Sequence, residues 1–128
     1  MKKVIEIFIP TKPVSASRPR FGNFSTYYSK SYMAYRKDTH AFLKTIAKKY
    51  PIKEKALFRV DIEFLCYKPK RPSNKECPRY DIDNLCKSPL DAITYAKMIW
   101  NDDIQILEIH ASKRYQEEGE PFGTKITI

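Results

Sequence analysis

The chain has 128 residues and carries 24 lysines and arginines against 15 aspartates and glutamates, a formal net charge of +9 at neutral pH. This length fits one domain with a single core, and contents of 42% hydrophobic and 13% aromatic residues exclude a mainly disordered chain. The basic balance favours a polyanionic partner such as nucleic acid; a solvated basic surface without a ligand is the alternative. No apolar run is long enough to cross a bilayer, and we expect a cytoplasmic protein without a membrane partner.

Cys66, Cys77 and Cys86 are odd in number, and none has the spacing of a zinc ligand or of a disulfide framework. We therefore expect three reduced thiols.

The first half of the chain predicts a strand, a long loop and a helix. Residues 3–9 alternate apolar side chains with a period of two, which indicates a strand that ends at Pro10. Residues 10–30 contain several prolines and a polar, aromatic stretch, and they predict a loop that could fold into a small hairpin. From 31 to 50, apolar residues recur at spacings of three, four and seven, which describes one face of a helix ended by Pro51.

The second half begins with a strand and a helix joined by a basic, proline-rich loop. Residues 57–67 alternate as a half-buried strand does. Apolar residues over 85–98 follow a helical face, which Pro89 interrupts because proline has no N–H and collides with the preceding turn. Either the helix kinks at Pro89, or its regular part begins with Ser88 as the N-cap and Pro89 in the first helical position.

Two further strands close the chain. Within residues 104–114, one face carries Ile104, Ile106 and His110 and the other Gln105, Leu107 and Ile109, which predicts a strand covered on both faces; residues 122–128 predict the last strand. The order of elements implies one α+β domain over residues 1–128, with a mixed sheet packed by two main helices.

The stretch RYDIDNLCKSPLDA, residues 79–92, gathers carboxylates in this basic chain. On a strand, Asp81 and Asp83 would point to the same face about 7 Å apart. A divalent cation would relieve their repulsion, and Mg²⁺ prefers one or two carboxylates together with water and phosphate oxygens. The alternative makes Asp81 a surface residue and Asp83 a helix N-cap. Asp102 or Asp103 would complete a three-carboxylate cluster if the second helix brings them back beside this pair; otherwise a tight turn explains them.

Lys87 lies four residues after Asp83 and four before Asp91. On a helix this spacing forms an i,i+4 charge ladder worth only about 0.2–0.5 kcal/mol per pair. The functional interpretation places the ammonium at the edge of the acidic cluster, where it positions a phosphate or stabilises a leaving oxygen. Asn84 could orient a carboxylate or assist the cap.

The combined pattern of DIDNLCKSPLDA, IWNDDIQI and HASKRY resembles the RusA-type Holliday junction resolvases. In that family a D-x-D-N-x-x-K motif precedes a helix with a further Asp, then an Asp pair and a downstream Lys. The segment PTKPVSASRPRF also resembles the family's proline- and arginine-bearing N-terminal segment. The resemblance implies a RusA-like fold and a Mg²⁺-dependent crossover junction endodeoxyribonuclease. Such an enzyme resolves four-way DNA junctions in recombination and repair by phosphodiester hydrolysis, as a homodimer.

The resemblance implies the catalytic residues and the metal ligands, and we also expect supporting and DNA-binding roles for nearby polar and basic residues. The catalytic set is Asp81, Asp83, Lys87 and Asp103. The metal ligands are Asp81, Asp83, Asp103 and Asp102. The supporting residues are Asn84 and Asp91. The basic residues expected to contact the DNA backbone are Arg18, Arg20, Arg79 and Lys113.

Two other functions stay open at this point. One is a non-catalytic DNA-binding module that stacks exposed bases on the aromatic residues of the N-terminal loop, which are Phe21, Phe24, Tyr27 and Tyr28. The other is a nuclease of the same family that acts on flaps or other branched DNA. We assign no catalytic role to either histidine, His40 or His110, and we expect Trp100 to be a core or dimer-contact residue.

Overall fold

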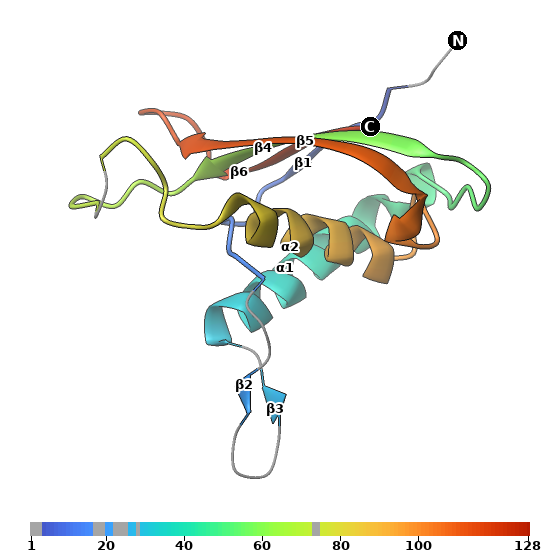
Figure 1. The fold of residues 1–128 in the computed structure, drawn as a ribbon, viewed down its shortest axis with the longest axis horizontal. Helices are drawn as coiled ribbons and strands as arrows, with labels where there is room; N and C mark the ends of the chain where they lie inside the picture. The colour runs from blue at the N-terminus through green and yellow to red at the C-terminus, as the bar shows by residue number, and fades with distance from the viewer. Residues whose placement is uncertain (1–3, 17–19, 22–25, 28, 73–74) are drawn as a thin grey trace.

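The computed structural model describes residues 4–16, 20–21, 26–27, 29–72 and 75–128; for 20–21 and 26–27 it describes the backbone alone. The fold is α+β, as predicted: a four-stranded mixed sheet carries two helices on one face (Figure 1). The sheet contains β1 (Glu6–Ile9), β4 (Phe58–Cys66), β5 (Ile106–Tyr115) and β6 (Gly123–Thr127), and the helices are α1 (Lys30–Ile46) and α2 (Ile82–Tyr95). Two 3₁₀ turns, η1 (Ala47–Lys49) and η2 (Asp103–Gln105), follow α1 and precede β5.

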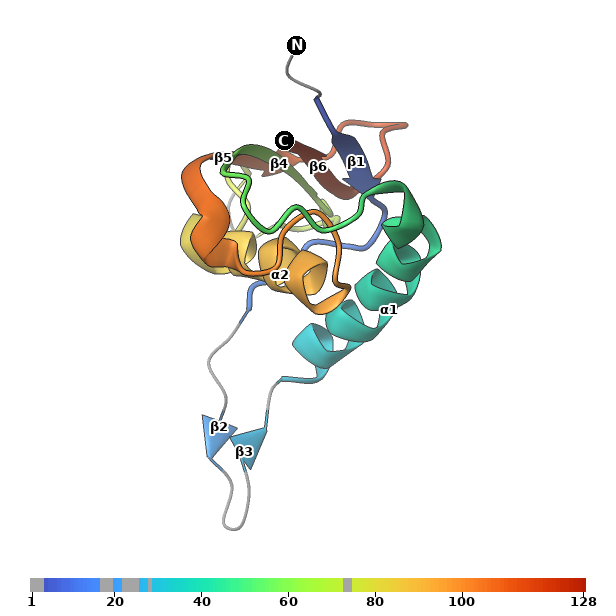
Figure 2. The same cartoon turned by 90° about the vertical axis from the view of Figure 1, so that its right-hand side faces the viewer.

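The predicted small hairpin is present in the long N-terminal loop. Strands β2 (Arg20–Phe21) and β3 (Thr26–Tyr27) pair antiparallel and lie beyond the helices, on the side away from the sheet (Figure 2). No helix in the described ranges has the length and apolarity needed to span a bilayer.

The strand order β1-β6-β4-β5 determines where α2 lies. β4 pairs parallel with β5 and antiparallel with β6, and β1 pairs antiparallel with β6. Parallel neighbours need a crossover connection, and α2 is the crossover helix between β4 and β5. Its first turn therefore follows the loop from the end of β4, and its last turn leads back to the start of β5.

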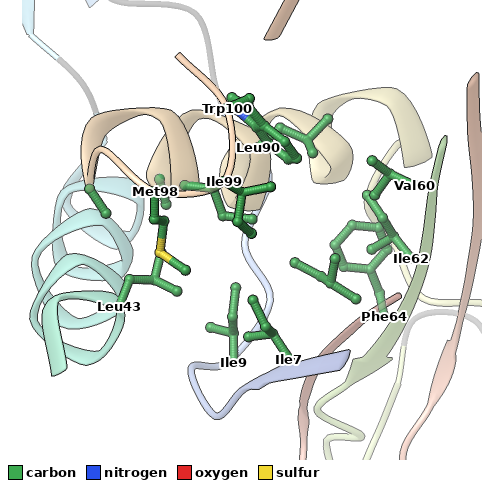
Figure 3. Close-up of a cluster of buried hydrophobic side chains, with 14 of the residues drawn as sticks. Ile7, Ile9, Leu43, Val60, Ile62, Phe64, Leu90, Met98, Ile99 and Trp100 are labelled. Atoms are coloured by element: carbon green, nitrogen blue, oxygen red, sulfur yellow. The ribbon is translucent and has the colours of Figure 1, made fainter. Parts of the chain in front are cut away.

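The core fills the space between the inner face of the sheet and the two helices (Figure 3). Val60, Ile62 and Phe64 alternate along β4 toward α2, and Leu43 reaches the same core from α1. Trp100 is fully buried there, which confirms its prediction as a core residue. The period of two in the strands and the helical spacing in α1 and α2 thus converge on one apolar layer.

The prediction that the strand at 104–114 is covered on both faces is wrong. β5 is an edge strand with a single neighbour, β4, and Leu107 and Ile109 on it are 71% and 45% exposed. An apolar run does not by itself distinguish a covered strand from an exposed edge, because coverage depends on elements that are distant in sequence.

The second helix is continuous through Pro89. It begins at Ile82, so the alternative in which it starts at Ser88 is wrong, and it ends at Tyr95, before Met98. Pro89 is buried among the residues that α2 packs on the core. Packing of this apolar face outweighs the one hydrogen bond that proline cannot donate.

The outer face of the sheet carries paired charges. Arg114 makes a bidentate ion pair with Glu120 at 2.7 and 2.8 Å, and Arg114 and Lys125 each lie 3.8 Å from Glu63. The hydrogen bond to the Arg114 guanidinium lowers the pKa of Glu120 to about 2. Carboxylates thus offset the cations of this face, and it does not present the excess positive charge of the chain.

Candidate active site

Asp81 and Asp83 lie at the start of α2 rather than on the strand that we considered. Asp81 is the N-cap in extended conformation (φ −67°, ψ 133°), and Asp83 lies in the first turn. The alternative with Asp83 as N-cap is therefore off by two residues. The Asp81 side chain makes no capping hydrogen bond, and both residues are exposed. The positive end of the helix dipole stabilises carboxylates at this position.

Two side chains of β5 hold the loop that leads into Asp81. The Lys113 ammonium donates hydrogen bonds to the carbonyls of Pro78, at 2.9 Å, and Tyr80, at 2.5 Å. The Tyr115 hydroxyl donates to the carbonyl of Cys77 at 3.0 Å. Lys113, which we expected at the DNA backbone, thus uses two of its three donors on the protein, and with Tyr115 it clamps the backbone before Asp81.

The N-terminal loop is bound along α2. The Ser88 hydroxyl donates to the carbonyl of Val14 at 2.6 Å, and the backbone N–H of Ala16 donates to the carbonyl of Asn84 at 3.0 Å. This contact places the start of the proline- and arginine-bearing segment beside the acid-bearing helix. Arg18 lies outside the described residues.

The turn that carries Asp102 and Asp103 is anchored on both sides. Trp100 donates its indole N–H to the Thr94 hydroxyl at 2.7 Å, which ties the turn to α2. After the turn, the buried Gln105 amide accepts the backbone N–H of Asn101 at 2.8 Å and donates to the carbonyls of Lys53 and Ala56, each at 2.8 Å. Gln105 was not singled out from the sequence, because its partners come from a loop about 50 residues away.

Asp91, Asp102 and Asp103 form one acidic group. The hydrogen bond with the Asp102 carboxyl, then burial and the charges of Asp102 and Asp91, raise the pKa of Asp103. Asp102 accepts the backbone N–H of Ile104 at 3.0 Å, which with the hydrogen bond from Asp103 lowers the Asp102 pKa. Burial raises the pKa of Asp91, and the charges of Lys87 and Arg36 oppose the rise. The charges of Asp91 and Asp102 disfavour the ionised form of Asp103, and a cation bound among these carboxylates would offset that repulsion.

The structure places the predicted carboxylates in two groups along α2. Asp83, Lys87 and Asp91 follow one another at i,i+4 spacing, so about 12 Å of helix axis separates Asp83 from Asp91. Asp103 lies with Asp91, whereas Asp81 and Asp83 lie at the N-cap and in the first turn of α2. Among the described residues, no three His, Cys, Asp or Glu side chains are arranged to hold one ion. The condition for a single three-carboxylate cluster, return of the second turn to Asp81 and Asp83, is not met.

A cavity between α1 and α2 brings the second acidic group together with residues to which the sequence assigned no role in the site. Arg36, Lys37 and His40 of α1 and Tyr95 of α2 line it, along with Asp91, Asp102 and Asp103. A sequence signal existed. The cavity residues of α1 lie at positions 33, 36, 37 and 40, and those of α2 include 88, 91, 92 and 95, so each helix contributes an i,i+3,i+4,i+7 stripe.

The remaining predicted DNA contacts differ in what the structure describes. Arg79 is exposed between the clamped carbonyls of Pro78 and Tyr80. The Arg20 side chain lies outside the described part of the chain. The same holds for the side chains of Phe21, Phe24, Tyr27 and Tyr28.

A scan against protein families matches residues 10–128 to a family described as endodeoxyribonuclease RusA. The chain belongs to the RusA endodeoxyribonuclease family. The match extends from the end of β1 to the last residue and includes both acidic groups, Lys87 and the Lys113 clamp. RusA-family membership makes the protein a nuclease that hydrolyses DNA phosphodiester bonds, and it favours this function over a binding-only module. A search of curated proteins gave no match.

Proposed function

We propose that the protein is a Mg²⁺-dependent endonuclease that resolves four-way DNA junctions in recombination and repair in the cytoplasm, with α2 as its catalytic element. The observation that carries this proposal is the exposed face of α2, where Lys87 lies midway between carboxylates of the first turn and carboxylates beside Asp103. A basic chain attracts DNA, and carboxylates on its surface repel phosphate unless they bind a cation. The family match supplies the reaction class.

The donor set fits Mg²⁺. This ion is bound through one or two carboxylates plus water and phosphate oxygens rather than by an all-protein cage. The pairs Asp81–Asp83 and Asp91–Asp103 each offer two carboxylates, and Asp102 adjoins the second pair. The hydrogen bond with the Asp102 carboxyl, then burial, raise the pKa of Asp103, and the charges of Asp102 and Asp91 add to the rise; a cation would compensate this added like charge. When bound, Mg²⁺ supplies positive charge that neutralises phosphate oxygens during hydrolysis.

The residues of the chain have distinct tasks in this proposal. Lys87 donates to a non-bridging oxygen of the scissile phosphate and stabilises the charge that develops there. A water molecule adds to phosphorus, the bond from phosphorus to one deoxyribose oxygen breaks, and that oxygen takes up a proton. The Lys113 clamp keeps Asp81 in place, and Asn84 fixes the N-terminal loop through its carbonyl. Arg79 and the arginines of the N-terminal loop, Arg18 and Arg20, bind flanking phosphates.

The distribution of charge supports DNA binding on the helix side of the molecule. The outer face of the sheet pairs its cations with carboxylates, whereas α1 presents Lys30, Arg36, Lys37 and Lys44 with Asp38 as its one acidic residue. Phosphate contacts from such a surface add affinity without base specificity.

A homodimer is the second part of the proposal, because a junction presents two strands to be cut. Ile104, Leu107 and Ile109 expose apolar side chains beside the unpaired edge of β5, and a partner subunit would cover them. Light scattering of the wild type should give twice the mass of one chain. Leu107→Lys should give the mass of a single chain. Tyr67→Lys, at an exposed position elsewhere, should leave the dimer intact.

Cleavage of a substrate panel tests the activity. Purified protein is incubated with a synthetic four-way junction, a flap and a linear duplex, each with Mg²⁺, Ca²⁺ or chelator. We expect paired cuts in the junction with Mg²⁺ alone, and binding with little cutting in Ca²⁺, because the larger ion tolerates other geometries. Preferential cutting of the flap would replace the junction as substrate, and equal rates in chelator would contradict the metal-dependent mechanism.

A further inference from the structure

The cavity between α1 and α2 has the size and lining of a nucleotide-binding site. Its volume is about 630 Å³, within the range of roughly 300–1,000 Å³ that small-molecule ligands occupy in proteins. Its walls are the two helical stripes at 33, 36, 37 and 40 of α1 and at 88, 91, 92 and 95 of α2, and the turn with Asp102 and Asp103 closes one side. The two helices lie side by side below the sheet (Figure 2).

One part of the cavity offers an aromatic surface. Tyr95 is 65% exposed and Met33 is 48% exposed, so both leave apolar surface open to a ligand. The ring of His40 lies 4.7 Å from the ring of Tyr95, at 57° between the two planes. A tyrosine supported by a neighbouring ring, with its remaining surface open, suits stacking of a nucleobase.

The other part of the cavity offers positive charge next to the carboxylates. Arg36 and Lys37 lie in the wall of α1, and the Arg36 guanidinium lies 5.8 Å from the centre of the Tyr32 ring. Asp91 lies within the electrostatic reach of both Arg36 and Lys87. A guanidinium in this position can bind a phosphate through two parallel N–H donors while the carboxylates hold a cation nearby.

We propose that this cavity holds one nucleotide of the bound DNA strand next to the cleaved bond, with its base on Tyr95 and its phosphate on Arg36. The inference rests on the proposed nuclease function and extends it to substrate selection. A base within a continuous duplex is stacked on both sides, and taking it out of the stack has an energetic cost that is smaller where pairing is already disrupted. A branch point supplies such a nucleotide, so the cavity favours branched DNA over linear duplex.

Binding and cleavage of junctions with a reporter base test the proposal. 2-Aminopurine is placed at each nucleotide around the cleavage site, and matched junctions carry an abasic residue there. In Ca²⁺, the reporter at one position should be quenched on binding to the wild type and not to Tyr95→Leu. Tyr95→Leu should weaken junction binding about tenfold, the scale of one lost base–aromatic stack, and should cost nothing further on the abasic junction.

Arg36 has its own matched comparison. Arg36→Gln should reduce single-turnover cleavage of the junction at least tenfold, and Arg36→Lys should restore it only in part, because an ammonium lacks the planar fork. The controls are Lys125→Gln, an exposed cation on the outer face of the sheet, and Tyr67→Leu, an exposed tyrosine outside the cavity; both should behave as wild type.

The outcomes separate this inference from the function on which it rests. If the wild type cuts junctions while Tyr95→Leu and Arg36→Gln match the controls, the nucleotide site is wrong and the nuclease stands. If Tyr95→Leu weakens binding equally on intact and abasic junctions, the base does not stack on Tyr95. If the wild type cuts no branched DNA, the proposed function fails, and reporter quenching in Ca²⁺ still decides the site.

Discussion

The Lys113 ammonium donates a 2.5 Å hydrogen bond to the backbone carbonyl of Tyr80. Tyr80 directly precedes Asp81, so a side chain of β5 fixes the backbone from which a proposed metal ligand projects. A positioning role and a DNA-contact role for Lys113 give different results. Lys113→Met should lower kcat about 10- to 100-fold through misplacement of Asp81, and should lower the free energy of unfolding by about 1–3 kcal/mol.

Salt dependence separates the two roles of Lys113. The slope of log Kd against log salt for junction binding should stay unchanged in Lys113→Met, as in the control Lys125→Met on the outer face of the sheet. A slope lower by about one would identify Lys113 as a phosphate contact instead. Tyr115→Phe, which removes the hydrogen bond to the Cys77 carbonyl, should show a weaker form of the same kcat defect.

Asp103→Asn should stabilise the protein without metal while impairing its function. The raised pKa of Asp103 means that folding disfavours its ionised form. This penalty is present above the raised pKa and is lost as the pH falls through it. At pH 7 with chelator, Tm should rise by about 1–3 °C, and the gain should shrink toward pH 4. Asp38→Asn, an exposed change on α1, serves as the control.

Added Mg²⁺ should reverse the order of stability, so that the wild type becomes more stable than Asp103→Asn. A ligand that binds only the folded state raises its stability, so saturating Mg²⁺ should raise the Tm of the wild type more than that of Asp103→Asn. If Mg²⁺ raised the Tm of the two proteins equally, Asp103 would not be a metal ligand.

Lys87 distinguishes catalysis from a surface charge ladder. If Lys87 only pairs with the charges of Asp83 and Asp91, Lys87→Ala should lower the free energy of unfolding by well under about 1 kcal/mol and leave cleavage intact. If Lys87 is a catalytic cation, Lys87→Ala should leave folding and junction affinity nearly unchanged and slow single-turnover cleavage about a hundredfold or more. Lys87→Arg should not restore the rate. Wild-type cleavage by Lys87→Ala under saturating protein and Mg²⁺ would end its catalytic role.

Gly123 is required by the packing of β6 on β1. Its φ is +152°, and an added Cβ would lie 2.6 Å from the Ile9 carbonyl oxygen and closer still to the Phe8 ring. Gly123→Ala should therefore lower the free energy of unfolding by about 2–4 kcal/mol in urea denaturation. Gly119 also has a positive φ, +79°, but a Cβ added there meets no atom within 4 Å. Gly119→Ala should therefore lower the free energy of unfolding by only about 1–2 kcal/mol. Equal losses of unfolding free energy in the two variants would mean that β1 moves away from the added Cβ at position 123 at little cost.

Local pattern was sufficient for most of the fold. A period of two predicted β1 and β4, helical spacing predicted α1, and proline density predicted the loop that contains the β2–β3 hairpin. The exposure of β5 and the passage of α2 through Pro89 did not follow from pattern, because both depend on which elements pack against them. Element type is a local property of the chain, whereas coverage is a tertiary one.

The site divides in the same way. The residue types and spacing of Asp81, Asp83 and Lys87 indicated metal and phosphate chemistry. The neighbours of Asp103 could not be predicted, because a crossover helix of unknown start separates it from Asp81, and α2 proved to place them at opposite ends. Arg36 and Tyr95 were missed although each continues an i,i+4 series on its helix, since facing stripes become visible only once the helices are packed together.

The most direct test of the proposed catalytic face is single-turnover cleavage of a mobile four-way junction by Asp83→Asn and Asp103→Asn, with Asp38→Asn as the matched control. The pairs Asp81–Asp83 and Asp91–Asp103 are each proposed to hold Mg²⁺, so both variants should lose cleavage by about a hundredfold or more in Mg²⁺. Their junction affinity in Ca²⁺ should equal or exceed that of the wild type, because each change removes negative charge near phosphate. Wild-type cleavage by Asp83→Asn together with Asp103→Asn would contradict the assignment of α2 as the catalytic element.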